Sequence, residues 1–177
     1  QTLSTDQDNA LVYEDVPKEM GEKVRDYFLN FSKKVCGWLN DAGYVYCDGD
    51  NMAQNPKWCQ PLSVWKRYFS GWISEPSAED LLQVKIFFDF KSAYGEDSLT
   101  SDLRKHVAAV TSRHPNFFQY LARNVLKVTP PIGFFGNIVV ESVETHGKAL
   151  DIKSSLMPIV DYARIYALKY NVDTANT

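Results

Sequence analysis

Two aspartates near the start of the chain are the clearest candidates for chemistry. Asp6 and Asp8 stand in the sequence TDQDN, directly before the apolar run Ala10–Tyr13. Residues two apart in an extended chain point to the same side, so both carboxylates are expected to lie together. Adjacent carboxylates repel unless a cation compensates their charge. Mg²⁺ suits this role, because it binds one or two carboxylates together with phosphate oxygens.

A third aspartate, Asp89, lies near the end of the predicted strand Val84–Phe90. An unpaired carboxylate after such an apolar run would be costly in a core. We therefore expect Asp89 at a strand end that is open to ligand, or paired with a cation such as Lys91. Two aspartates on one strand and a third on a neighbouring strand form the arrangement that metal-dependent phosphate chemistry needs.

The pattern of two aspartates also has plainer interpretations. In a solvated turn, Asp6 would be an Asx-turn or helix-cap residue. A second pair, Asp48 and Asp50, flanks Gly49 in a turn-forming cluster. The turn context favours a solvated turn for this second pair, which we rank below Asp6 and Asp8.

Charge and composition narrow the class of protein. The net charge is −3 and the sequence pI is about 5.6, which argues against a dedicated nucleic-acid-binding surface. Phosphate ligands stay compatible with this charge, because a metal ion supplies positive charge locally. The three cysteines have no paired spacing, which argues against a disulfide framework and a zinc site.

The sequence predicts a cytoplasmic protein. Unpaired cysteines fit a reducing compartment. No apolar run reaches the length of a membrane span, and the polar, acidic N-terminal residues do not resemble a signal peptide. The chain begins at Gln1 without an initiator Met, so we interpret it as part of a longer protein.

Apolar periodicity predicts an α+β (or α/β) layer followed by a helical C-terminal half. Residues 51–60 are predicted to be irregular, and Asn137–Val143 to be extended or a short helix. Pro158 is compatible with the last helix only in its first turn. The predicted strands are Ala10–Tyr13, Tyr44–Cys47 and Val84–Phe90, and the predicted helices are Glu19–Asn40 (buried face Val24, Phe28, Phe31, Val35 and Leu39), Pro61–Ile73, Ala78–Leu82, Leu99–Ser112, Asn116–Leu126 and Ser155–Tyr170.

A set of short motifs together resembles a bacterial nucleotidyltransferase family. Its members sit beside cyclic-nucleotide-binding and CBS modules in signalling proteins, and are similar to the catalytic domain of protein-PII uridylyltransferase. The motifs, in chain order, are TLSTDQDNALVYED, YCDG, MAQNPKW, PLSVW, FFDFK, YGE, PPIGFF, LDIK and PIVDYAR.

The resemblance implies the nucleotidyltransferase fold shared with DNA polymerase β. That fold has a small mixed sheet flanked by helices, here followed by a C-terminal helical region. We expect residues 1–95 to form the α/β core and residues 96–177 the helical region. The resemblance places the family's Gly-Ser phosphate loop just upstream of Gln1. These 177 residues alone are therefore expected to bind nucleotide poorly and to be inactive.

The resemblance also implies roles for individual residues. Asp6, Asp8 and Asp89 match the metal-binding acids, and Asp89 is also the candidate general base for an attacking hydroxyl. Lys91 stands where the family has Arg; it binds phosphate as a point charge, without a bidentate fork. The nucleotide-binding candidates are Thr5, Asn9, Asn55, Lys91 and Lys153.

Several of these residues have a structural alternative. Asn9 would hold the aspartate loop by hydrogen bonds. Asn55, with Trp58 and Trp65, would form a structural loop with buried tryptophans rather than a pocket wall. Lys153 would form an ion pair with a nearby acid. We also expect Asp161 and Arg164, three apart on the last helix, to pair with each other.

The leading functional hypothesis is transfer of a nucleoside monophosphate from an NTP to a hydroxyl, with Mg²⁺ (or Mn²⁺) as cofactor. By analogy the acceptor would be a side chain of a regulatory protein, with sensory modules in the same polypeptide and no nucleic-acid or membrane partner. The alternative is a non-catalytic module of a signalling protein that binds nucleotide or a partner. A third hypothesis is a helical interaction domain in the C-terminal half, which an exposed apolar patch would support.

Overall fold

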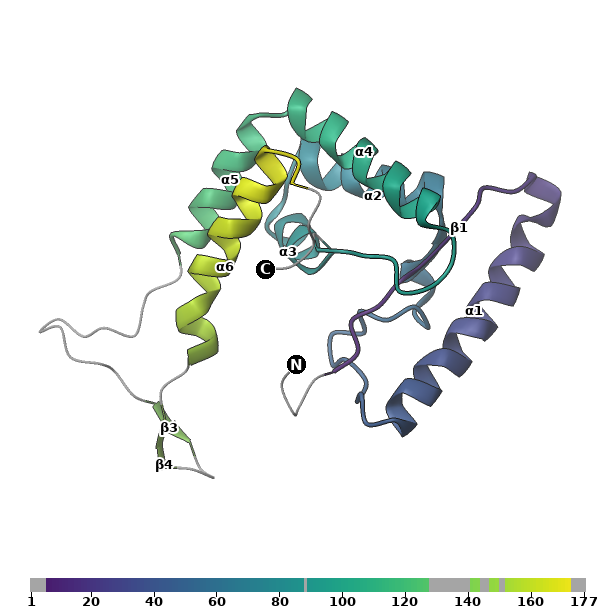
Figure 1. The fold of residues 1–177 in the computed structure, drawn as a ribbon, viewed down its shortest axis with the longest axis horizontal. Helices are drawn as coiled ribbons and strands as arrows, with labels where there is room; N and C mark the ends of the chain where they lie inside the picture. Colours follow the sequence, from purple (N-terminus) through teal and green to yellow (C-terminus); the bar gives the residue numbers. More distant parts are fainter. Residues whose placement is uncertain (1–5, 88, 128–140, 144–146, 150–151, 173–177) are drawn as a thin grey trace, which may run out of the picture. The chain divides into compact units, whose positions relative to one another are not determined.

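The computed structural model describes residues 6–87, 89–127, 141–143, 147–149 and 152–172 (Figure 1). The chain forms two compact units. The first contains residues 1–68 and 96–103, and the second contains residues 69–95 and 104–177. The predicted α+β class is confirmed, with helices predominating over two small sheets. The predicted division near residue 95 stays a prediction.

The first unit is built on one pair of parallel strands. Strand β1 (Leu11–Tyr13) pairs with β2 (Cys59–Pro61), with Val12 opposite Gln60. β1 confirms the predicted strand. β2 follows the 3₁₀ turn η1 (Pro56–Trp58) and lies largely in a segment predicted to be irregular. Three residues that end in proline carry no periodicity, so pattern alone does not reveal this strand.

Helix α1 (Lys18–Asp41) connects the two strands and ends before Gly43, whose φ of 99° only glycine adopts readily. Its length agrees with the prediction, but the predicted buried face is partly wrong. Phe31 is 44% exposed, and the buried side chains are Ser32 and Cys36. The Ser32 hydroxyl lies 3.8 Å from the Cys59 sulfur of β2. Small side chains let helix and strand approach this closely, so they occupy the contact in place of Phe31.

Aromatic side chains complete the core of the first unit. Trp58 and Trp65 are buried and stack with ring centroids 5.9 Å apart, and Tyr68 packs edge-on against both. Trp65, on helix α2 (Leu62–Ser74), donates its indole N–H to the Leu11 carbonyl at 3.2 Å. This bond ties α2 to β1. The structural interpretation of the two tryptophans is confirmed.

In the second unit, the predicted strand Val84–Phe90 is wrong. Helix α3 (Ala78–Phe87) covers most of it. Ser77 and Asp80 cap its first turn reciprocally, with the Asp80 N–H donating to Ser77 Oγ at 3.1 Å and the Ser77 N–H to Asp80 Oδ2 at 2.9 Å. Leu81, Val84 and Phe87 are buried, at helical spacing. Asp89 therefore follows a helix and lies in a turn.

The remaining helices largely confirm the predictions. They are α4 (Asp97–Arg113), α5 (Asn116–Val125) and α6 (Ile152–Lys169), with α5 and α6 packed side by side (Figure 1). α6 begins about one turn earlier than predicted, so Pro158 lies beyond the first turn, which corrects that expectation. The predicted loop of residues 130–136 lies outside the described residues.

A short antiparallel pair precedes α6. β3 (Glu141–Val143) pairs with β4 (Gly147–Ala149). Extended structure at 141–143 agrees with one of the two predicted states for Asn137–Val143, while residues 137–140 lie outside the described part of the chain. No described helix combines the length and the apolar character that crossing a membrane requires.

The three cysteines are expected to differ sharply in reactivity. Cys36 and Cys59 are buried, while Cys47 is half-buried. Burial raises the pKa of the Cys59 thiol, although the Ser32 hydroxyl partly opposes this. Because the thiolate is the reactive form, native protein titrated with Ellman's reagent near pH 8 should show one fast thiol. Cys47→Ser should abolish that fast phase, and three equally fast thiols would contradict the packing.

Candidate functional site

The two aspartates that precede β1 lie side by side. Asp6 forms a parallel bridge with Val45, and the Gln7 N–H donates to the Val45 carbonyl at 2.9 Å, so this segment is extended. Asp6 and Asp8 are exposed, and the residue between them is buried. A carboxylate oxygen of each lies within 4.8 Å of the other and of Cys47 Sγ. Side chains thus alternate between outward and inward directions, as expected for an extended chain, and both carboxylates lie on the outward side.

Gln7 anchors this segment from the inside. Its side-chain amide Nε2 donates to the Cys36 carbonyl of α1 at 2.9 Å and to the Tyr44 carbonyl at 2.8 Å. Gln7 is only 3% exposed. Because neighbouring side chains in an extended chain point to opposite faces, fixing Gln7 inward fixes its two neighbours outward. Sequence reasoning missed Gln7, although alternation between two exposed acids requires the middle residue to face the core.

Asn9 continues the same support. Its side-chain Oδ1 accepts the Ala53 N–H at 2.8 Å, and its Nδ2 lies 3.4 Å from the side-chain oxygen of Gln7. Its backbone N–H donates to the Asn51 carbonyl at 3.1 Å. Asn9 thus binds the aspartate segment to residues 51–53. These contacts agree with the structural interpretation of Asn9, while its nucleotide-binding role stays a prediction.

Asn55 also has structural partners. Its side-chain oxygen accepts the Lys57 N–H at 2.9 Å and so caps η1, and its Nδ2 donates to the Asp50 carboxylate at 2.9 Å. Asp50 has a φ of 52° and lies in a tight turn. Among the described residues, neither Asp48 nor Asp50 belongs to a cluster of three groups that could bind a metal. The second aspartate pair therefore agrees with the turn interpretation.

Asp89 belongs to the second unit, where it is held by an arginine. Arg164 Nε donates to Asp89 Oδ2 at 2.9 Å, and both side chains are about three-quarters buried. Pairing with a cation was one of the two predicted alternatives for Asp89; the cation is Arg164 and not the suggested Lys91, whose side chain is exposed. Arg164 also lies 3.6 Å from the Asp161 carboxylate, which confirms the predicted pair on α6.

Asp161 extends this network to α3. It is 3% exposed, and its Oδ2 accepts a hydrogen bond from Lys85 Nζ at 2.6 Å. The groups alternate in sign from Lys85 through Asp161 and Arg164 to Asp89. Such a chain compensates each charge locally, which buried charges require. It connects α3, the Asp89 turn and α6 within the second unit.

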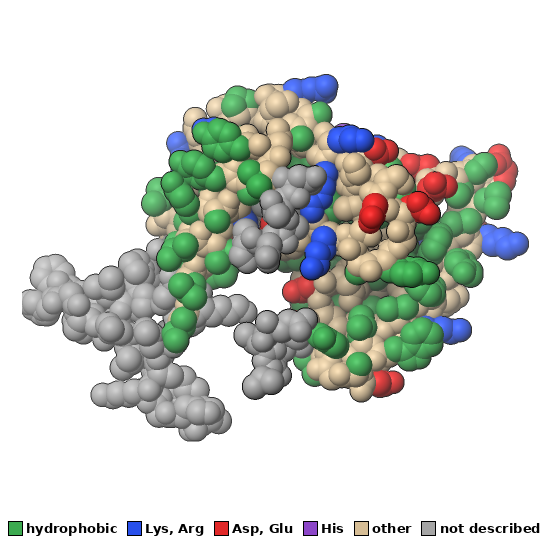
Figure 2. Space-filling model, viewed as in Figure 1, with side chains coloured by type: hydrophobic (Ala, Val, Ile, Leu, Met, Phe, Trp, Pro, Cys, Tyr) green, Lys and Arg blue, Asp and Glu red, His purple; other side chains and the backbone are tan. Residues whose placement is uncertain are grey.

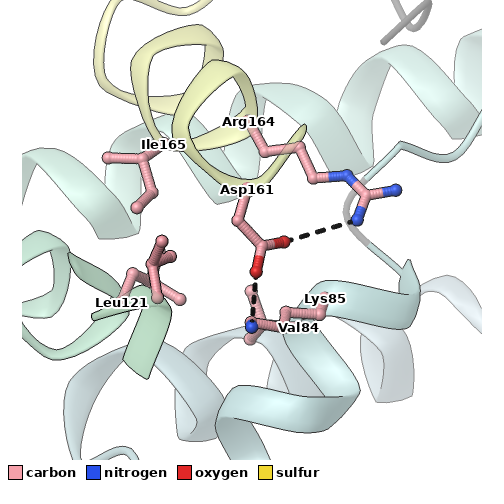
Figure 3. A pocket seen from close by; sticks show the side chains of 7 residues that line it. Val84, Lys85, Leu121, Asp161, Arg164 and Ile165 are labelled. Carbon is pink, nitrogen blue, oxygen red and sulfur yellow. Dashed lines mark hydrogen bonds and ion pairs between the residues drawn. The ribbon is translucent and has the colours of Figure 1, made fainter. Parts of the chain in front are cut away.

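A small cavity adjoins this network (Figure 3). It is lined by Val84, Lys85, Leu121, Val125, Asp161, Arg164 and Ile165. Its volume is about 20 Å³, which is room for about one water molecule. Ligand pockets are typically about 300–1,000 Å³. The cavity is therefore part of the packing and is not a nucleotide site.

The other candidates are distributed as follows. Thr5 lies outside the described residues, and so does the side chain of Lys153, whose backbone lies in α6. Lys91 and Lys153 belong to the second unit with Asp89. Asp6, Asp8 and Asn9 thus come together in the first unit, and Cys47 is a neighbour that sequence reasoning did not include. The roles predicted for Thr5, Lys91, Lys153 and Asp89 stay predictions.

The two carboxylates can bind a hard divalent cation. Mg²⁺ takes oxygen ligands at about 2.0–2.1 Å and keeps several waters, so two carboxylates on an exposed edge leave room for phosphate oxygens. Cys47 adds a soft sulfur, which zinc or copper prefers and magnesium does not. The carboxylate pair fits Mg²⁺ or Mn²⁺, with the thiol as a bystander for these two ions.

Removing the internal anchor should destabilise the first unit. Gln7→Met keeps the approximate shape but loses both hydrogen bonds, so we expect a loss of about 1–3 kcal/mol in the free energy of unfolding. Urea denaturation measures this change. The control is Gln60→Met, which removes an exposed hydrogen bond to the Pro56 carbonyl and should cost under about 0.5 kcal/mol. Equal effects of the two substitutions would contradict the anchoring role of Gln7.

Comparisons with known proteins give two family matches. Residues 1–79 match the family described as "Putative nucleotidyltransferase DUF294". Residues 115–177 match the family described as "Putative nucleotidyltransferase substrate binding domain". No curated protein and no solved structure matches the chain. The chain is thus similar to a nucleotidyltransferase family over the segment that carries Asp6 and Asp8, and to a nucleotidyltransferase substrate-binding domain over the segment that carries α5 and α6.

Proposed function

We propose that the chain is part of a nucleotidyltransferase that transfers a nucleoside monophosphate from an NTP to a hydroxyl group. Asp6 and Asp8 would bind Mg²⁺ or Mn²⁺ together with the phosphates of the nucleotide. The observation that carries the proposal is the pair of exposed carboxylates within 4.8 Å, fixed outward by a buried glutamine. The family match over residues 1–79 supports it independently.

The chemistry of the ligand groups fits this reaction. A metal bound to two carboxylates orients the phosphates and neutralises the charge that develops on them during transfer. The contribution of the protein is rigidity, because Gln7 and Asn9 hold the two carboxylates before the metal arrives. Fixed ligands need little rearrangement when the nucleotide binds.

Asp89 would complete the site as a third metal ligand or as the general base for the attacking hydroxyl. Its carboxylate is held 2.9 Å from Arg164 Nε, which fixes the orientation that either role requires. Lys91, two residues further on, and Lys153 at the start of α6 would supply charge to the phosphates. The match of residues 115–177 to a substrate-binding domain is consistent with such a contribution from the second unit.

The acceptor would be a side chain of a regulatory protein in the cytoplasm. The transferase itself would belong to a signalling polypeptide that also contains sensory modules. This part of the proposal rests on the resemblance of the motifs to protein-modifying nucleotidyltransferases. The alternative, a regulatory module that binds nucleotide without turnover, uses the same aspartates. Measuring turnover of the NTP distinguishes the transferase from this binding module.

The first test is binding of metal and nucleotide. On the 177-residue chain, Mn²⁺ titrations followed by electron paramagnetic resonance should detect a metal site that Asp6→Asn/Asp8→Asn loses. The matched control is Asp48→Asn/Asp50→Asn, which alters the other aspartate pair and should bind normally. Because the resemblance places the phosphate loop upstream of Gln1, calorimetry with ATP, UTP, GTP and CTP uses a form extended upstream by about 30–40 residues, the size of one supersecondary unit. The same aspartate variants are compared in that form.

If both double variants bind Mn²⁺ equally well, Asp6 and Asp8 do not form the metal site. If the extended form binds Mn²⁺ but no nucleotide, the metal site is supported and the transferase proposal is contradicted.

The second test separates a chemical role of Asp89 from a structural one. In the extended form, Asp89→Asn should slow pyrophosphate release from the preferred NTP by about 10²–10⁴-fold, the range for losing an acid–base group. Arg164→Met also removes the ion pair but keeps the carboxylate, so it should lose less activity at similar thermal stability. If Arg164→Met loses as much activity as Asp89→Asn, the role of Asp89 is structural and not chemical.

A further inference from the structure

The outward face of α6 carries a continuous apolar stripe. It consists of Ile152, Leu156, Ile159, Ala163, Tyr166 and Tyr170, all of them exposed. Figure 2 shows hydrophobic side chains along this helix. Tyr170 lies one residue beyond α6, but its N–H bonds to the Tyr166 carbonyl at 3.0 Å, so the helical path includes it. Large exposed apolar patches mark interaction sites.

The spacing of this α6 stripe is that of a coiled-coil seam. Successive members are separated by four, three, four, three and four residues, which places them at alternating d and a positions of a heptad. The opposite face of the helix is already occupied, since Asp161, Arg164 and Ile165 line the internal cavity. The stripe is therefore a second face, separate from the face that packs inside the unit.

We propose that the α6 stripe binds the same stripe of a second copy of this chain, as an antiparallel helix pair. In that register Ile152 lies opposite Tyr170, Leu156 opposite Tyr166, and Ile159 opposite Ala163. Each aliphatic side chain meets an aromatic or small one, and interiors pack best when facing volumes complement each other. A parallel pair would instead place tyrosine on tyrosine and leave a gap between two alanines.

The area available is sufficient for a stable dimer. Tyr162 flanks the stripe and packs against the Tyr166 ring at a tilt, and Tyr162, Tyr166 and Tyr170 are 59%, 45% and 63% exposed. An aromatic side chain buries about 150–250 Å², so the tyrosines of both copies offer roughly 500–800 Å². With Ile152, Leu156 and Ile159 added, the total passes the ~1,000 Å² of a specific interface.

Charge does not oppose self-pairing. Partner choice in coiled coils is set largely by charged residues at the positions that flank the seam. Here those positions hold Lys153, Ser155, Val160, Tyr162, Ala167 and Lys169. The only charged residues are lysines near the two ends, and no acidic or basic pattern selects a different helix. When two identical α6 helices pair, these flanking positions do not bring a row of like charges together.

A similar exposed stripe on α1 is a weaker candidate. Met20, Tyr27, Phe31 and Trp38 are exposed there. However, the heptad position between Phe31 and Trp38 is Lys34, and Lys23 occupies a position that flanks the stripe. A charge within the seam weakens pairing. The α6 stripe has no such interruption.

Sedimentation equilibrium tests the proposal on the full chain. We expect a species of twice the 20.2 kDa chain mass at micromolar concentration. Ile159→Glu should raise the dimer Kd by about 30-fold or more, the loss expected for a central interface residue. Leu126→Glu is the control, because Leu126 is 84% exposed but lies outside α6. It should leave the dimer intact.

Three outcomes would overturn the proposal. The wild-type chain could be monomeric at high micromolar concentration, including the case in which it instead binds phosphatidylcholine–phosphatidylserine vesicles. The dimer could survive Ile159→Glu while circular dichroism shows the variant to be folded. Finally, the dimer could be lost on Trp38→Glu and not on Ile159→Glu, which would place the contact on α1.

Cysteine crosslinking tests the orientation. In a Cys47→Ser background, the antiparallel pair places residue 156 of one copy opposite residue 166 of the other. A mixture of Leu156→Cys and Tyr166→Cys proteins should form the mixed disulfide, because a disulfide needs Cα atoms within about 7 Å. Disulfides between two copies of Leu156→Cys, without mixed ones, would show a parallel pair and overturn the proposed register.

Discussion

The buried amide of Gln7 is the interaction on which the candidate site depends. Two exposed carboxylates can be held close together only if the backbone between them cannot rotate. The two hydrogen bonds from Gln7, to α1 and to the segment before Cys47, provide that restraint. They also explain why the parallel pair β1–β2 can be so short. The sheet does not position the aspartates alone, because α1 and the Val45 bridge hold the same segment from the other side.

The sequence predicted those parts of the fold that have a long, regular pattern. β1, α1, α2, α4 and α5 have clear apolar periods or capping signals, and their bounds agree within a few residues. The first half of α3 was predicted as the helix Ala78–Leu82, but its second half was mistaken for a strand. Val84, Ile86 and Phe87 form a short apolar run, and such a run does not distinguish helix from strand. β2 and β4 are too short to have a period.

In the candidate site too, the features that depend on local sequence were predictable and the contacts between distant residues were not. Asp6 and Asp8 were predictable because alternation is a local property of an extended chain. The partners of the site are not local: Cys36 and Tyr44 lie 29 and 37 residues from Gln7. Arg164 lies 75 residues from Asp89. No pattern within one segment specifies such pairs. A cation partner for Asp89 was one of two predicted alternatives, with Lys91 as the nearby example, whereas the ion pair joins distant segments.

The placement of the tryptophans gives each unit its own optical reporter. Trp58 and Trp65 stack in the first unit, where their indole transitions should couple and give a paired signal in near-ultraviolet circular dichroism. Trp72 is buried in the second unit against Phe87. Emission from Trp72 would follow the second unit by itself in a protein whose other indoles are replaced by phenylalanine. The order in which the two units unfold is therefore accessible without any added label.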